Sequence, residues 1–220
     1  MKLKLCGAAK IVTGSCYWIK IGETQILVDC GMFQGRKEIT RLNYEPFLFE
    51  PKRIKYLFLT HAHIDHSGLI PKLKSQGFKG KIFATSATVD LCRIMLEDSA
   101  HIQEMENEYE NKRRRREGLP LRTPLYTVQD ARDSFSLFER VEYNKLCSIT
   151  KDIQVRYNDA GHIIGSAIIE MFIDDNGKKT KIVFSGDLGQ WDVPIIEDPT
   201  LIEDADYILV ESTYGNRLHE

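Results

Sequence analysis

The chain has 220 residues with a formal net charge of −2, 42% hydrophobic residues and 28% charged residues. This is an ordinary composition for a globular protein, and the charge excludes an overall basic field, so any nucleic-acid contact has to be local. No apolar run approaches the about 18 residues of a membrane span, and the first residues carry no signal-peptide pattern, so we expect no membrane contact. The cysteines are scattered, odd in number and without a C-x-x-C pair, which favours reduced thiols and a cytoplasmic location. They are Cys6, Cys16, Cys30, Cys92 and Cys147.

The first thirty residues predict a β meander. Three β-prone runs, Lys2–Cys6, Cys16–Ile21 and Thr24–Asp29, are separated by glycines. The third run is continuously apolar before Asp29, and a carboxylate at the exit of a buried strand is costly unless it is paired or near a cation. Asp29 could simply cap a turn ahead of Gly31. Its place beside the histidine cluster described next favours a role at a metal site.

The segment Thr60–His66 lies between a predicted strand and a predicted helix. The run Ile54–Leu59 before it is apolar and aromatic, as in a buried strand, and apolar residues at helical spacing follow Asp65 as far as Gly77. The segment is therefore expected at the carboxyl end of a strand, where open α/β sheets place their ligands.

The spacing of ligand-type residues in this segment indicates a metal site. His61 and His63 are two residues apart, so in an extended segment their side chains point the same way and can bind one divalent transition metal. Asp65 and His66 lie beyond the bend and can face a second ion. The alternative is a polar loop that is rich in histidine by chance. This is the weaker interpretation, because four of the six residues are of types that bind metals.

The middle of the chain is expected to be helical. Ser86–Glu110 predicts a long helix and Val128–Phe138 a further one. Between them, a stretch rich in glutamate precedes the five consecutive cations Lys112–Arg116. These cations could form a local RNA-facing edge, or they could be the solvated end of a helix whose acid-then-base order suits its dipole and its i,i+4 pairs.

Residues 150–187 return to β structure. Ile153–Tyr157, Ser166–Ile173 and Lys181–Phe184 predict strands, with an Asn-Gly hairpin signal between the last two. His162 and Asp187 stand where strands run into glycine-containing turns. Together with Asp29 and the histidine segment, residues that can bind a metal now follow four predicted strands. Chance is a poor explanation of this arrangement.

Together these motifs resemble the metallo-β-lactamase superfamily. The carriers are H-x-H-x-D-H at residues 61–66, the strand ending at Asp29 before it, and the strand ends at His162 and Asp187 after it. The segment 211–215, Glu-Ser-Thr-Tyr-Gly, resembles the first motif of the β-CASP branch, whose members process nucleic acids. The resemblance implies an α/β fold, an αββα four-layer sandwich in which two packed sheets have helices outside.

The resemblance also implies a dinuclear zinc site. The implied ligands are His61, His63 and His162 for one ion, Asp65 and His66 for the second, and Asp187 as the bridge. Asp29 would orient the site through hydrogen bonds, and Glu211 would match the branch's acidic motif residue near the active centre. With Asp65, these two are the expected catalytic residues.

In the β-CASP branch a further domain follows the motif at Glu211, and two later histidine-bearing motifs complete the site. This sequence ends at Glu220. We therefore interpret residues 1–206 as the N-terminal part of a metallo-β-lactamase-like domain, incomplete on its C-terminal side, and residues 207–220 as the last strand and the start of a truncated β-CASP region. His219 could in principle substitute for a missing histidine, but so near the end it is expected to be exposed.

The leading functional hypothesis is a metal-dependent hydrolase that cleaves single-stranded RNA. Two zinc ions would lower the pKa of a bridging water, and the resulting hydroxide would attack phosphorus. One alternative is a hydrolase of another ester or thioester, which the motif at residues 211–215 disfavours. Another is an inactive metal-binding fragment. An incomplete sandwich would expose apolar sheet surface, so a homodimer is also possible.

Overall fold

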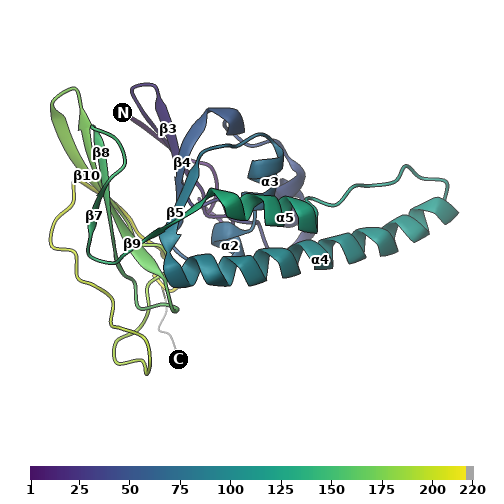
Figure 1. The fold of residues 1–220 in the computed structure, drawn as a ribbon. Coiled ribbons are helices and arrows are strands. Elements are labelled where there is room, and N and C mark those ends of the chain that lie inside the picture. The colour runs from purple at the N-terminus through teal and green to yellow at the C-terminus, as the bar shows by residue number, and fades with distance from the viewer. Residues whose placement is uncertain (217–220) are drawn as a thin grey trace.

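The computed structural model describes residues 1–216, which fold into two β-sheets packed face to face (Figure 1). The first sheet has six strands. In spatial order they are β1 (Lys2–Leu5), β2 (Tyr17–Ile21), β3 (Thr24–Val28), β4 (Ile54–Phe58), β5 (Lys81–Thr85) and β6 (Phe138–Val141). β1, β2 and β3 pair antiparallel, and β3 to β6 pair parallel. The predicted meander is thus confirmed, and it continues into a parallel half-sheet.

The second sheet has five strands. In spatial order they are β11 (Tyr207–Leu209), β10 (Lys178–Phe184), β9 (Ala167–Asp175), β8 (Ile153–Asp159) and β7 (Leu146–Ser148). β9 and β10 form the predicted hairpin, with Asn176 at φ +58° and Gly177 at φ +86° in its turn.

Helices cover the outer face of the first sheet (Figure 1). The helices of the described residues are α1 (Lys37–Thr40), α2 (Ile64–Ser67), α3 (Ile70–Ser75), α4 (Ser86–Arg116) and α5 (Val128–Ser134), with 3-10 turns at Arg41–Tyr44, Pro51–Arg53 and Phe135–Leu137. α4 begins where Thr85 caps it by accepting a hydrogen bond from the Thr88 backbone. Its C-terminal half projects away from the two sheets.

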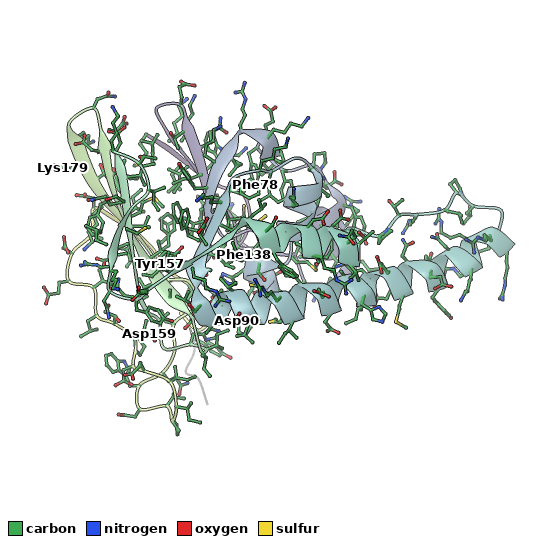
Figure 2. All side chains as sticks on the ribbon, in the orientation of Figure 1. Phe78, Asp90, Phe138, Tyr157, Asp159 and Lys179 are labelled. Carbon is green, nitrogen blue, oxygen red and sulfur yellow. The ribbon has the colours of Figure 1, made fainter. Side chains whose placement is uncertain are left out.

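Two apolar cores result from strict alternation along the central strands. On β3, Ile26 and Val28 face the second sheet, whereas Leu27 between them faces the helices. All three are fully buried, as expected of a strand covered on both sides. Tyr157, labelled in Figure 2, lies between the sheets and donates a hydrogen bond from its hydroxyl to the Phe83 carbonyl. This bond ties β8 to β5.

The sandwich differs from the sequence prediction in two places. The helix predicted over Val128–Phe138 is wrong in its last turn: α5 ends at Ser134, and Phe138 begins strand β6. Pairing with β5, from Ile82 to Phe138 onward, outweighs the helical pattern there. Conversely, α4 is longer than predicted and includes the whole basic run.

The expected αββα architecture is confirmed for three of its layers. Among residues 1–216, no helix packs on the outer face of the second sheet, where the chain between β10 and β11 runs instead (Figure 1). None of the helices in this described range is long and apolar enough to span a membrane. His219 and the end of the predicted region 207–220 lie outside the described residues.

Candidate metal centre

Four segments from both sheets meet at one edge of the sandwich. Asp29 follows β3, and its backbone N–H donates to the Phe58 carbonyl at the end of the parallel neighbour β4. The Ala167 N–H of β9 donates to the Thr60 carbonyl at 2.9 Å. Gly186, after β10, has a left-handed φ of +56°, and a Cβ there would lie 2.9 Å from the Thr60 side chain. Such close approach of backbones brings the ligand-type side chains together.

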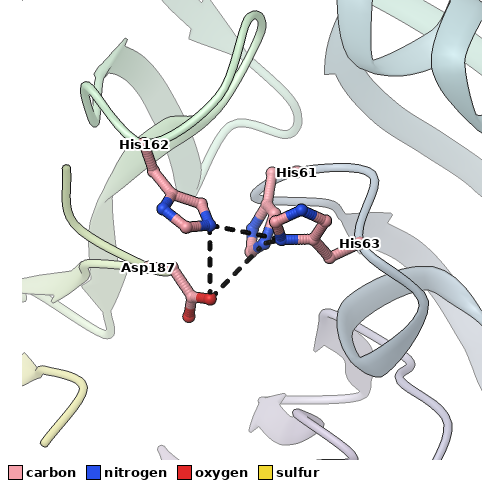
Figure 3. A group of neighbouring side chains, drawn as sticks. All are labelled: His61, His63, His162 and Asp187. Atoms are coloured by element: carbon pink, nitrogen blue, oxygen red, sulfur yellow. Dashed lines mark hydrogen bonds and ion pairs between the residues drawn. The ribbon is translucent and has the colours of Figure 1, made fainter. Parts of the chain in front are cut away.

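Three histidines and one aspartate form a compact cluster at this edge (Figure 3). His61 Nε2 lies 3.0 Å from His63 Nδ1, and His162 Nε2 lies 3.2 Å from the same nitrogen. Asp187 Oδ2 is 3.7 Å from His61 Nε2 and 3.6 Å from His162 Nε2. One ligand atom from each residue thus lies within 4.8 Å of all the others.

This donor set fits a tetrahedral divalent metal. Zinc–ligand bonds of about 2.0–2.2 Å place tetrahedral ligand atoms about 3.3–3.6 Å apart, close to the spacings in the cluster. Burial lowers the pKa of both His61 and His162, which keeps the two imidazoles neutral, as metal binding requires. Imidazole and carboxylate donors suit zinc, manganese or iron.

The two oxygens of the Asp187 carboxylate face different histidines. Oδ2 lies toward the three-histidine cluster, while Oδ1 is 3.2 Å from His66 Nε2. Burial would raise the pKa of this carboxyl, but the hydrogen bond to His66 and the surrounding histidines lower it. Asp187 therefore lies between His66 and the pair of His61 and His162.

Asp29 holds His66 from the other side. Its Oδ2 lies 2.7 Å from His66 Nδ1 and accepts a hydrogen bond from the Ser15 hydroxyl, while Oδ1 accepts one from the Thr60 N–H. Burial lowers the pKa of His66, but the carboxylates of Asp29 and Asp187 outweigh it and raise that pKa to about 10. Asp29 itself is fully buried, at a left-handed φ of +58°. Asp29 thus contacts Ser15, Thr60 and His66 at once.

The other two predicted site residues lie beside the cluster. Glu211 lines both cavities that border Asp187, and its Oε1 accepts a hydrogen bond from the Leu188 N–H. Asp65 lies in α2, and its main-chain carbonyl accepts a hydrogen bond from Ser15 N–H. Among residues 1–216, Asp65 is not one of the four residues whose ligand atoms cluster.

Ser15 and Thr60 are the residues that the sequence analysis missed. Both hydroxyls hydrogen-bond to Asp29, and the Thr60 hydroxyl also lies 3.1 Å from His61 Nδ1. A signal for Thr60 was its position directly before the first histidine. Ser15 belongs to the segment Thr13-Gly14-Ser15, which resembles the RNA-processing members, but its contact with Asp29 joins two strands and cannot be predicted from the local pattern.

The model of the metallo-beta-lactamase superfamily matches residues 10–144. The chain belongs to this superfamily. This metallo-beta-lactamase-type chain is also similar over its full length to proteins of RNA metabolism. It is 35% identical over 219 residues to "Ribonuclease TTHA0252" of Thermus thermophilus, covering 100% of this chain and 45% of that protein.

Two further relatives match about as much of the chain. The "Transcription termination factor FttA" of Methanosarcina mazei is 30% identical, with 98% of this chain and 32% of that protein covered. The "Cleavage and polyadenylation specificity factor 73" of Drosophila melanogaster is 30% identical, with 100% and 30% covered. These names confirm the resemblance to the RNA-processing branch. The chain spans less than half the length of these relatives.

Solved structures support the fold alone. A Cronobacter sakazakii metallo-beta-lactamase with a HARLDQ motif superposes with a TM-score of 0.51 at 16% identity, over 84% of this chain and 57% of that one. A B3 metallo-beta-lactamase with an active-site glutamic acid superposes with a TM-score of 0.50 at 18% identity, over 87% and 65%. The predicted fold class is thereby confirmed.

Proposed function

We propose that this chain carries the metal centre of a hydrolase that cleaves phosphodiester bonds of single-stranded RNA. The observation that carries the proposal is the placement of Asp187, whose Oδ2 lies near the Nε2 atoms of His61 and His162 while its Oδ1 lies near Nε2 of His66. The relatives add the substrate class, since they are named as a ribonuclease and as factors of transcription termination and of cleavage and polyadenylation. On this proposal, residues 1–206 form the metallo-beta-lactamase-like unit and 207–220 begin a further region.

The proposed ligands divide into two sets. His61, His63 and His162 would hold one zinc ion, His66 and Asp65 the second, and Asp187 both. Zinc ions bound there would supply a water of lowered pKa and positive charge against the phosphate. Asp29 keeps the His66 ring oriented with Nε2 toward Asp187. Glu211 would act at the rim, where it borders both cavities beside Asp187.

Metal content per chain tests the centre directly. Mass spectrometry of the purified, unchelated protein should give two ions per chain. His61→Ala should lose at least one ion, because its nitrogen is central to the cluster. His101→Ala is the matched control, since His101 is an exposed histidine on α4. One ion or none in the wild type, or equal content in the two variants, would contradict a dinuclear site.

A substrate panel tests the chemistry. The metal-loaded protein should cleave a single-stranded RNA oligonucleotide and leave lactam and thioester substrates intact, and Asp187→Asn should abolish cleavage. Turnover of thioesters alone would replace the RNA proposal by the other hydrolase class. Two bound ions without turnover of any substrate would support a metal-binding module that needs the additional length of the relatives.

We also propose a cytoplasmic location and a homodimer for this chain. All five cysteines are free thiols, which supports a reducing, cytoplasmic setting. The edge strand β11 exposes Tyr207 and Ile208 by 55% and 60%, which supports pairing of two copies. Light scattering should then give twice the chain mass, and a monomer at high concentration would contradict the dimer.

A further inference from the structure

Of the two cavities that border Asp187, one has a volume of about 290 Å³ and lies on the side of His66. Its lining includes His66 and Asp187. It also includes Tyr17 from β2 and Phe184 from β10, whose ring centroids are 5.4 Å apart. The volume is at the lower end of small-molecule sites, which suits a single nucleotide unit rather than an extended ligand.

The loop between β1 and β2 supplies the open side of this cavity. Lys10, Ile11 and Val12 all line it. Val12 is 70% exposed, although it is apolar, so an apolar surface is presented to whatever enters. Lys10 makes no ion pair among residues 1–216, although other exposed lysines such as Lys81 and Lys112 do. A cation without an ion pair and an exposed apolar side chain therefore line the same cavity as His66 and Asp187.

The loop is held in a strained and specific conformation. Ala8 and Lys10 both have left-handed backbones, with φ of +49° and +66°, which residues other than glycine adopt rarely. Gly7 touches Gly14, where an added Cβ would lie 1.8 Å from the Gly14 carbonyl oxygen. Thr13 is tied to Gln34 by two hydrogen bonds. The rest of the fold thus fixes a conformation that costs free energy, as is common at functional sites.

This cavity shares part of its lining with a neighbouring cavity on the other side of Asp187. Asp187, Glu211 and Thr213 line both this cavity and another of about 300 Å³ on the side of His162. A strand that crosses the centre would occupy both cavities and place a phosphate between them. Of these two cavities, only the one on the His66 side has a lysine in its lining.

We propose that the cavity between the β1–β2 loop and the Tyr17–Phe184 pair is a nucleotide subsite. Lys10 binds the phosphate that neighbours the scissile one, and Val12 contacts the base. Charge pairing with phosphate and apolar contact with a base face are the two general means of binding single strands without sequence readout. This inference rests on the proposed RNA-cleaving function and adds a positioning residue for its substrate.

Binding of a fluorescein-labelled hexauridylate to the zinc-loaded protein tests the subsite. Anisotropy would be measured at 4 °C over a range of salt concentrations, with a gel to show that the RNA stays intact. Lys10→Ala should weaken binding about fivefold and reduce the magnitude of the salt slope by about 0.7, the value for one phosphate contact on a single strand. Lys10→Arg should keep both values.

Two variants separate the roles and control for the charge change. Val12→Ser should weaken binding without changing the salt slope, because it removes a base contact only. Lys2→Ala is the matched control, since Lys2 is an exposed lysine at the far end of β1, and it should behave like wild type. Equal affinity and slope for Lys10→Ala and Lys2→Ala, with RNA bound by the wild type, would overturn the subsite and leave the function standing. A wild type with two zinc ions that binds no RNA would overturn both.

Discussion

His66 lies between two carboxylates, with Nδ1 2.7 Å from Asp29 Oδ2 and Nε2 3.2 Å from Asp187 Oδ1. This chain of contacts joins a residue from the end of β3 to one from the end of β10 through a histidine of α2. It fixes the ring orientation of His66 before any ion is bound. Asp29 therefore has a structural role at His66, and the proposed function adds a role in metal affinity.

Asp29→Ala should weaken metal binding about 10–100-fold and lower the free energy of unfolding of the metal-free protein by about 3 kcal/mol. The reason is that Ser15, Thr60 and His66 all lose their acceptor inside the protein. A chelator competition assay and chemical denaturation measure the two effects. Asp29→Asn keeps the shape and one acceptor oxygen, so its loss in both assays should be smaller. Unchanged metal affinity in the alanine variant would exclude an orienting role.

Gly31→Ala should destabilise the protein by about 3 kcal/mol or more and reduce metal content. An added Cβ would lie 1.6 Å from the Asp65 carbonyl oxygen, so the segment that carries the histidines would have to move. Gly22→Ala serves as control, because Gly22 has a left-handed φ of +53° but open space around it. That variant should cost only about 1 kcal/mol, from backbone strain. Equal melting temperatures for the two variants would refute the steric argument.

Glu170 is a buried carboxylate on the outer face of the second sheet, and it makes stability depend on acid pH. Burial would raise its pKa, but hydrogen bonds with Arg156, Lys181 and Asn158 outweigh this and lower the pKa from 4.5 to about 2. Because the folded-state pKa lies below the unfolded-state one, the stabilisation is fully present above about pH 4.5. It is lost as the pH falls toward about 2.

Glu170→Gln should accordingly lower the free energy of unfolding near pH 7 by about 2 kcal/mol, since it removes the buried carboxylate that Arg156 and Lys181 pair with. Between pH 4.5 and 2 the variant should lose less further stability than wild type does. Urea denaturation at several pH values measures both effects. Parallel pH profiles for wild type and variant would show that another carboxylate is responsible.

Lys72→Met should destabilise the protein by about 2–3 kcal/mol. The buried Lys72 ammonium donates hydrogen bonds at 2.6 Å to the carbonyls of Asn43 and Glu45, which would be left without a partner. Thermal unfolding would report the loss. Lys79→Met is the same change at an exposed lysine and should be within about 0.5 kcal/mol of wild type. A similar melting temperature for both would mean that the carbonyls find water instead.

The local pattern of the chain was sufficient to predict most of the strands, though not β6 or β7, and to select candidate ligands. His61 and His63 share a face because an extended segment repeats every two residues, and Asp29, His162 and Asp187 each follow a glycine-bounded apolar run. These are short-range features, so they can be recognised before the fold is known. Segment 128–138 was assigned wrongly, because its last residues become a strand only through pairing with β5.

The partners of each residue depended on the tertiary structure. Only the packing of the two sheets places Asp187 between His66 and the three-histidine cluster, and Ser15 beside Asp29. The same packing makes Lys10 line one cavity with His66 and Asp187, although it stands 56 residues before His66 in the chain. Such contacts join segments far apart in sequence, and the periodicity of any one segment carries no information about them.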